Sequence, residues 1–301
     1  MMIDLVGRLE TLAGVRLGPT EIYENPTPRH IAHLLRKGSD TPKHIIPIQQ
    51  SGARPPLFAV HILGTNEEYF RPLAQLLGPD QPVMGVSFAS LGPDSPVGVE
   101  NTAARYCADI NAYYPEGPIH LIAVSLASYL AVELAHQLKA GGRDVATLAI
   151  IDAAGPGGRR EVTGLPRGIA HLRRARYIGR DYPAHLLRNR MYDLRVAHAA
   201  RVLRRDARRG NVAAPVNVAQ FDAANEAALD QYTPRKIDVP LIIFRAESNF
   251  LDSAEGIRTG LGWAEIASAG FEVIDVQGIH LSLLQEPNVE KIAQVLLKRW
   301  Y

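Results

Sequence analysis

The 301-residue sequence contains a single cysteine, Cys107, so an internal disulfide is excluded and a reducing, cytoplasmic location is expected. It also lacks any run of 18 or more apolar residues, and its first ten residues carry charges, so neither a membrane span nor a signal peptide is predicted. Aromatic residues make up only 7%, and no interleaving of basic and aromatic side chains points to nucleic-acid binding. With 47% hydrophobic and 21% charged residues, the composition predicts a globular protein with an ample core.

Acidic residues are scarce in one segment. The net charge is only +2, yet residues 158–210 hold fifteen arginines against four acids. The segment is helical in composition and has no strand-like runs, so we expect a helical insertion. Two interpretations of its charge stay open: a solvated helical face, and a surface that attracts an acidic partner.

From residue 57 onward, short apolar runs alternate with amphipathic segments. Continuous apolar strands separated by helices predict an α/β fold, a mostly parallel sheet with helices on both faces. The predicted strands are 57–62, 82–88, 120–124, 145–151, 239–247 and 271–276, and the predicted helices are 67–77, 102–114, 126–142 and 289–301.

Residues 1–37 form a separate, helical part in this prediction. Leu5, Leu9 and Leu12 lie at helical spacing and Gly14 can end that helix, while a second helix is expected over 29–37. The following segment, 38–56, holds two glycines and four prolines and is predicted to be a linker.

Three polar residues follow strands of the predicted sheet: Ser125, Asp152 and His280. In open α/β sheets, the carboxyl ends of the strands are where functional groups gather. Each residue alone fits a plainer role, as a helix N-cap, a turn former and a solvated loop histidine. Together they stand in the Ser…Asp…His order in which histidine deprotonates a serine nucleophile and the acid orients the imidazole.

Other candidates stay open. Glu247 and Asp252 follow the run VPLIIFR, residues 239–245, and compete with Asp152 for the role of the acid. His61 is expected to be structural, because no second histidine or cysteine lies nearby at metal-binding spacing.

The stretches RPPLFAVHILGTNEEYFRPLAQLLGPDQPVMGV, HLIAVSLASYLAVELAHQL and FEVIDVQGIHLSLLQEP resemble the thioesterase domains of nonribosomal peptide and polyketide synthetases. The resemblance implies an α/β-hydrolase domain over 57–301 with a helical lid at about 157–218. It makes Ser125 the nucleophile, Asp152 the acid and His280 the base, and it ranks Asp152 before Asp252 as the acid. The backbone N–H of Leu126 becomes one oxyanion donor, and that of Ile62, or less favourably Leu63, the second.

Residues 1–37 resemble the second half of an acyl or peptidyl carrier domain, and the serine that bears phosphopantetheine in that family lies before this point. The resemblance therefore implies a partner carrier, whose arm brings an acyl or peptidyl chain, with hydrolysis or cyclisation as the release step. No metal or redox cofactor, nucleic acid or membrane partner is expected. The elbow AVSLAS and the loop HILGT lack glycines that the family usually has. A slow or inactive carrier-binding module and a general carboxylesterase are the alternatives.

Overall fold

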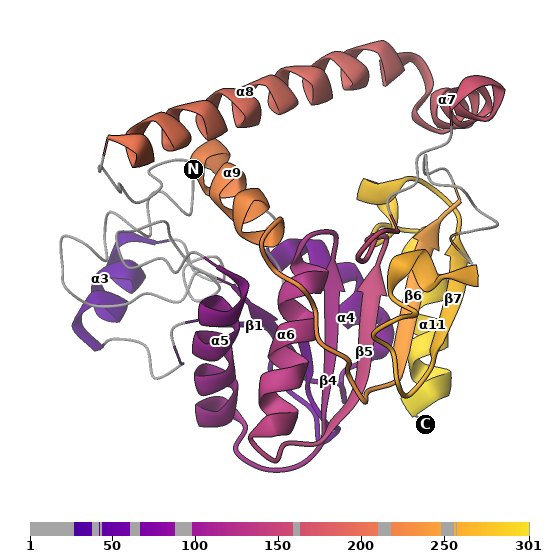
Figure 1. Ribbon diagram of the computed structural model, residues 1–301. Coiled ribbons are helices and arrows are strands. Elements are labelled where there is room, and N and C mark those ends of the chain that lie inside the picture. Colours follow the sequence, from indigo (N-terminus) through magenta and orange to yellow (C-terminus); the bar gives the residue numbers. More distant parts are fainter. Residues whose placement is uncertain are drawn as a thin grey trace.

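The computed structural model describes residues 27–37, 42, 44–60, 67–87, 98–158, 163–209, 218–247, 256 and 258–300. Seven strands in this part form one sheet in the order β1-β3-β2-β4-β5-β6-β7 (Figure 1). Neighbouring strands run parallel except β1 and β3, which confirms the predicted α/β fold with a mostly parallel sheet. The strands are β1 (Ile45–Gln49), β2 (Leu57–Val60), β3 (Val83–Val86), β4 (Ile119–Val124), β5 (Val145–Ile151), β6 (Leu241–Ala246) and β7 (Phe271–Val276).

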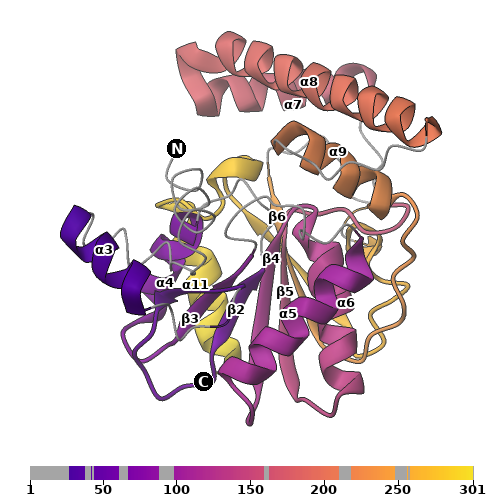
Figure 2. The ribbon, with the colours of Figure 1, turned by 90° about the vertical axis from the view of Figure 1, so that its left-hand side faces the viewer.

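Helices cover both faces of the sheet, because its central strands are apolar at every position. Side chains alternate along β2: Phe58 and Val60 enter one core cluster, and Leu57 and Ala59 enter the other. One face is covered by α5 and α6, and the opposite face by α4 and α11 (Figures 1 and 2). These helices are α4 (Arg71–Leu77), α5 (Val99–Tyr113), α6 (Ala127–Ala140) and α11 (Asn288–Trp300), with the short η1 (Glu67–Phe70) before α4.

The predicted linker, 38–56, contains an edge strand, so the prediction is wrong over β1. Ile45, Ile46 and Ile48 are buried, and β1 pairs antiparallel with β3. Pro47 cannot donate to a sheet ladder, but an edge strand tolerates this, and the register shifts between Pro47 and Gln49. The prolines that suggested a linker therefore mark the edge of the sheet.

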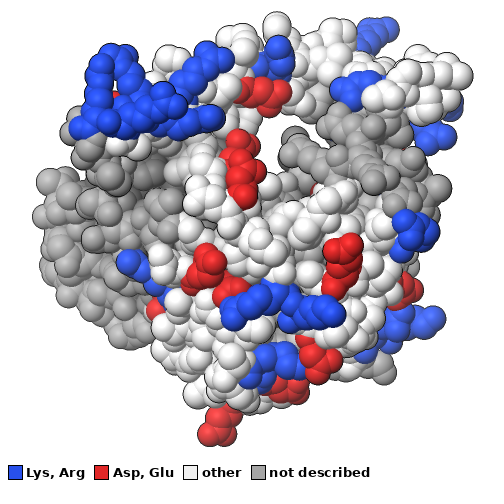
Figure 3. Space-filling model, in the orientation of Figure 1, with Lys and Arg blue, Asp and Glu red and all other residues white. Residues whose placement is uncertain are grey.

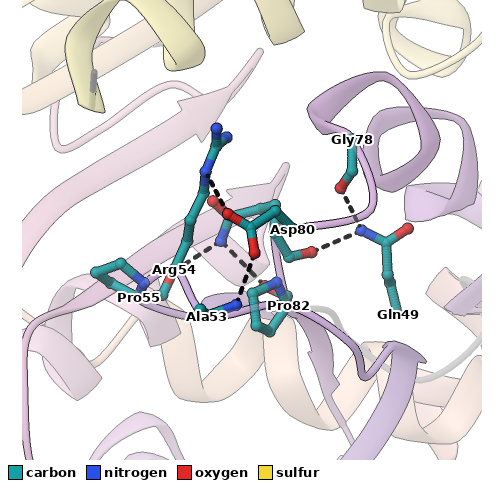
Figure 4. Close-up of polar contacts among 8 residues, drawn as sticks. Gln49, Ala53, Arg54, Pro55, Gly78, Asp80 and Pro82 are labelled. Atoms are coloured by element: carbon teal, nitrogen blue, oxygen red, sulfur yellow. Dashed lines mark hydrogen bonds and ion pairs between the residues drawn. The ribbon is translucent and has the colours of Figure 1, made fainter.

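Side-chain contacts fix the rest of this segment (Figure 4). Gln49 Nε2 donates to the carbonyl oxygens of Gly78 and Gln81, both at 2.7 Å. Asp80 accepts from the Ala53 N–H at 2.9 Å and pairs with Arg54 at 3.2 Å. The chain between β1 and β2 is thus held against the turn that precedes β3.

Of residues 1–37, only 27–37 are described, and they include α3 (Pro28–Lys37) where a helix was predicted. The other predicted helix, around Leu5 to Leu12, lies outside the described residues, and the carrier-like assignment of 1–37 stays a prediction.

The arginine-rich insertion between β5 and β6 is helical, as predicted. It contains α7 (Gly164–Ile178), η2 (Gly179–Asp181), α8 (Tyr182–Arg208) and α9 (Val218–Leu229). Both ribbon views show α8 arching above the sheet with α9 between them (Figures 1 and 2). The helices of the insertion extend beyond the predicted end at about residue 218, because α9 packs against α8 through Ala223, Val196 and Ala199. We call α7, η2, α8 and α9 the lid.

The lid carries apolar side chains on its surface. Among the described residues, all large apolar side chains classed as exposed lie on α7 and α8, apart from Leu76 on α4. Leu165 and Leu172 are the most open, at 79% and 72% exposure. No helix in the described part of the chain combines the length and apolarity needed to span a bilayer.

His120 on β4 makes the stability of the fold sensitive to acid. The ring is 6% exposed and stacks on Trp300 of α11 with centroids 4.2 Å apart. Burial lowers the pKa of His120 to about 4, an effect that Asp144 partly opposes. Between pH 6.5 and 4 the unfolded chain therefore binds a proton that the folded chain does not.

We expect the free energy of unfolding to fall by about 3 kcal/mol through this pH window on account of His120. Urea unfolding at pH 7, 5.5 and 4 measures it, and His120→Leu should flatten the pH dependence. His198→Gln, at an exposed position on α8, is the control and should retain the wild-type slope. An unchanged slope in His120→Leu contradicts the prediction.

Candidate active site

Ser125 lies in a sharp turn between β4 and α6. Its φ is +55°, a left-handed conformation that is uncommon for a residue with a side chain. The Ser125 N–H donates to the Ile151 carbonyl at 3.0 Å, and the Ser128 N–H donates to the Ser125 carbonyl at 3.0 Å. The neighbouring strand and the first turn of α6 therefore hold a strained residue in place, as a nucleophile elbow requires.

The elbow forms without its usual glycines. Ala123 and Ala127 are 0% and 1% exposed and belong to the core cluster beneath α6. The methyl groups thus pack into the junction of strand and helix and do not prevent the turn. Ser128 is also fully buried, and its hydroxyl has no hydrogen-bond partner among the described residues. Small side chains can therefore replace the glycines here.

Asp152 leaves β5 at the same level at which Ser125 leaves β4, since Val124 pairs with Ile151. Asp152 also has a positive φ, +46°, and its N–H donates to the Phe244 carbonyl at 2.7 Å. Its side chain is 5% exposed. Oδ1 accepts from the Ala246 N–H at 2.9 Å, which directs the carboxylate along the edge of the sheet.

His280 meets this carboxylate from the other side. It opens the short helix η4 (His280–Ser282) after β7, and its Nδ1 lies 2.9 Å from Asp152 Oδ2. A carboxylate at Nδ1 favours a proton there, which leaves Nε2 as the basic nitrogen. The side chain is 30% exposed, so the imidazole is accessible while the acid is not. The structure thus joins Asp152 to His280 at the edge where Ser125 also emerges.

Glu247, a rival for the role of the acid, does not take this place. Glu247 is exposed, and its N–H donates to the Val276 carbonyl at 3.0 Å. Asp252 lies outside the described residues. The carboxylate on the imidazole is that of Asp152.

Of the predicted oxyanion donors, only Leu126 lies among the described residues. Leu126 directly precedes α6, and its N–H makes no hydrogen bond to another described residue. The N–H groups at a helix N-terminus stabilise a negative charge, so the Leu126 N–H fits the predicted role of an oxyanion donor. Ile62, the predicted second donor, its alternative Leu63, and His61 lie outside the described residues.

Two residues near the acid were not predicted. Tyr69 on η1 donates to the His280 carbonyl at 3.5 Å, and burial, with the charge of Asp152, raises the pKa of Tyr69 to about 12. Arg174 comes from α7 in the lid; burial lowers its pKa, and Tyr182 and Asp152 oppose that shift. The arginine-rich composition of the lid does not distinguish Arg174 from its neighbours, and no local pattern marks Tyr69.

Comparisons with known proteins identify the family of the chain. A family model described as "Thioesterase domain" matches residues 55–299. The chain belongs to the thioesterase-domain family. The match begins ten residues after the start of β1 and includes Ser125, Asp152, the lid and His280.

Two curated relatives are synthetases. The chain is 26% identical over 157 residues to a dimodular nonribosomal peptide synthase of Bacillus subtilis (strain 168), and 31% identical over 160 residues to malpibaldin synthetase of Mortierella alpina. Each match covers 51% of this chain and only 7% and 3% of those proteins. Their activities as whole proteins therefore do not transfer directly to this thioesterase domain.

Solved structures share the fold. A four-domain nonribosomal peptide synthetase bound to AMP and glycine aligns over 99% of this chain and 23% of its own, with a TM-score of 0.61 and 22% identity. The NocB thioesterase domain in covalent complex with a fluorophosphonate nocardicin G analog aligns over 85% and 99%, with a TM-score of 0.57 and 20% identity. The α/β-hydrolase fold of the thioesterase domains is therefore that of this chain.

A metal centre has no candidate in the described residues. No group of three or more histidine, cysteine, aspartate or glutamate side chains gathers there in a way that could hold an ion.

Proposed function

We propose that this thioesterase domain releases an acyl or peptidyl chain from the phosphopantetheine arm of a carrier domain by serine acyl-enzyme catalysis. The observation that supports it most strongly is the 2.9 Å contact between Asp152 Oδ2 and His280 Nδ1, at the edge of the sheet where Ser125 sits in a strained turn. No metal or redox group takes part in this proposal.

In the first step, Ser125 Oγ attacks the thioester carbonyl carbon and its proton passes to His280 Nε2. The oxyanion that forms accepts from the Leu126 N–H at the start of α6. The carbon–sulfur bond then breaks, His280 returns the proton to the departing thiolate, and the acyl group stays on Ser125 as an ester.

In the second step, His280 takes a proton from water, or from a hydroxyl or amine of the chain itself. The attack on the ester gives an acid in the first case and a cyclic product in the second, and Ser125 recovers its proton. Asp152 stays ionised throughout and stabilises the imidazolium that forms in both steps.

Two measurements test the proposal: labelling by a fluorophosphonate, which reacts with an activated serine, and a comparison of thioester with ester substrates. The wild type should gain one fluorophosphonate adduct by intact mass, and should hydrolyse acyl groups on a carrier's phosphopantetheine faster than simple aryl esters of the same acyl group. An adduct with a preference for simple esters favours a carboxylesterase. A wild type without an adduct or turnover favours a binding module.

The carrier partner is a further part of the proposal. Five arginines at the end of α8 line one groove with a volume of about 610 Å³: Arg201, Arg204, Arg205, Arg208 and Arg209. All five are exposed. Figure 3 shows a dense patch of basic side chains at this end of the lid, and a hollow beneath α8. Such a surface attracts an acidic helix or a phosphate group.

We expect Arg204→Glu/Arg208→Glu to raise the KM for an acyl-carrier substrate about tenfold, because the reversed charges repel an acidic carrier. The two side chains lie one turn apart in the groove, so the double variant changes one continuous surface. The KM for a small acyl thioester without a carrier should not change. Steady-state kinetics at low and at 0.5 M salt measures both.

The control is Arg71→Glu/Lys298→Glu, with the same charge change on the exposed surface of α4 and α11. Equal losses in the two double variants would show a general charge effect and remove the groove from the proposal.

A further inference from the structure

The turn that carries His280 is closed by Ser282. The Ser282 N–H donates to the Ile279 carbonyl at 2.8 Å, and the Ser282 hydroxyl lies 3.0 Å from both the N–H and the carbonyl oxygen of Ile279. The two hydrogen-bonded ends of this turn are buried: Ile279 is 7% exposed and Ser282 is 5% exposed. The backbone on either side of the imidazole is therefore fixed by one serine side chain.

Asn288, the first residue of α11, holds that serine. Its Nδ2 lies 3.0 Å from the Ser282 carbonyl oxygen and 3.2 Å from the Ser282 hydroxyl, and the residue is 6% exposed. The chain packs closely around this pair. A Cβ on Gly278, whose φ is +113°, would lie 2.5 Å from Ser282 Oγ and 2.7 Å from Asn288 Nδ2. The Asn288 amide is therefore closely packed against the turn, residues 279–282, that carries His280.

The same amide nitrogen also reaches the lid. Nδ2 of Asn288 donates to the hydroxyl of Tyr177 on α7 at 2.9 Å. In Figure 1, α7 stands at one end of the α8 arch, on the side of the molecule where β6, β7 and α11 lie. A primary amide has two N–H hydrogens, so its three acceptors share them and their positions depend on one another. One side chain therefore contacts both the loop of the base and the lid.

We propose that Asn288 is a positioning residue for His280, and that Tyr177 completes its placement when α7 is docked. The inference rests on the proposed function only for the role of His280 as the base. Docking of the lid and placement of the imidazole are then coupled: when α7 moves away, Asn288 loses one acceptor and the turn keeps only its internal bonds. Because a base must be held within a fraction of an ångström of its productive position, the loosened turn lowers the rate of chemistry and leaves ground-state binding unchanged.

Three variants test the coupling: Tyr177→Phe, Asn288→Ala and the two combined. We expect the rate of fluorophosphonate capture by Ser125, and kcat for a small acyl thioester, to fall roughly 10- to 100-fold in Asn288→Ala. Tyr177→Phe should lower both about threefold and leave KM within about twofold of the wild type. The combined variant should match Asn288→Ala, because both substitutions remove the same link.

The matched control is Tyr113→Phe, which removes a half-buried hydroxyl at the end of α5, far from this network in the sequence and the fold. It should leave capture and kcat unchanged. A second readout is the downfield proton resonance of the His280 ring N–H bound to Asp152, assigned by its loss in His280→Gln. It should broaden in Tyr177→Phe and not in Tyr113→Phe.

The outcomes separate this inference from the proposed function. If the wild type captures the fluorophosphonate but cleaves no thioester, the proposed function fails, and the capture rates and the ring resonance still decide the role of Asn288. Independent, multiplicative effects of the two substitutions overturn the coupling, as does an unchanged capture rate in Tyr177→Phe. If Asn288→Ala does not fold, Tyr177→Phe alone decides, because Tyr177 is 41% exposed and its ring is retained.

Discussion

Ser125→Ala is expected to lower kcat/KM for an acyl thioester by about a thousandfold or more and to abolish the fluorophosphonate adduct. The substitution removes the only atom that forms the bond to the acyl carbon, while the turn keeps the hydrogen bonds of its backbone to Ile151 and Ser128. The measurement is initial rate by thiol release, with intact mass after labelling.

Ser128→Ala is the matched control for this experiment. It removes a hydroxyl three residues away, at the start of α6, that has no hydrogen-bond partner among the described residues. Labelling and turnover should stay at the wild-type level. An adduct of undiminished yield in Ser125→Ala would show that another residue reacts, and would refute the assignment of the nucleophile.

Asp152→Asn is expected to lower kcat about 10³- to 10⁴-fold at neutral pH with little change in KM. In the native site, Oδ1 accepts from the Ala246 N–H and Oδ2 lies near the His280 Nδ1, both at 2.9 Å. An asparagine has one carbonyl oxygen for the two donors. If that oxygen stays on Ala246, the amide N–H₂ faces the imidazole and favours the tautomer with its proton on Nε2, which cannot accept the proton of Ser125.

Glu247→Gln provides the comparison, because Glu247 follows the neighbouring strand and is exposed. Its kcat should remain within about twofold of the wild type. A large loss in Glu247→Gln together with near-normal turnover in Asp152→Asn would transfer the role of the acid to the end of β6.

Much of the sheet was predictable because its central strands are continuous apolar runs between helical patterns. The same patterns placed Ser125, Asp152 and His280 at strand ends, and the structure joins the last two. β1 was missed because its signal is weak: five residues interrupted by Pro47, whose pairing partner on β3 lies about forty residues later in the chain. An antiparallel edge strand of this kind is defined by its neighbour more than by its own sequence.

The surroundings of the acid and base were not predictable either. Tyr177 and Asn288 meet across 111 positions in the sequence, and Tyr69 reaches the His280 carbonyl across 211. None of the three belongs to a repeating pattern, so only the folded chain brings them together. The elbow is the reverse case, in which the sequence suggested a difficulty that the structure does not have. The sequence lacks the glycines that the family usually has, yet the methyl groups of Ala123 and Ala127 pack in the core.

The strained backbone at Ser125 and Asp152 has an evolutionary consequence. The N–H of each residue is bound to the next strand along, Ser125 to Ile151 of β5 and Asp152 to Phe244 of β6. The lid is inserted between those same two strands, so its length and sequence can diverge without displacing either residue. The proposed nucleophile and acid therefore keep their backbone anchors whatever the length of the lid. The loop of His280, in contrast, is bound to α7 through Asn288 and Tyr177, so a different lid changes the surroundings of the proposed base directly.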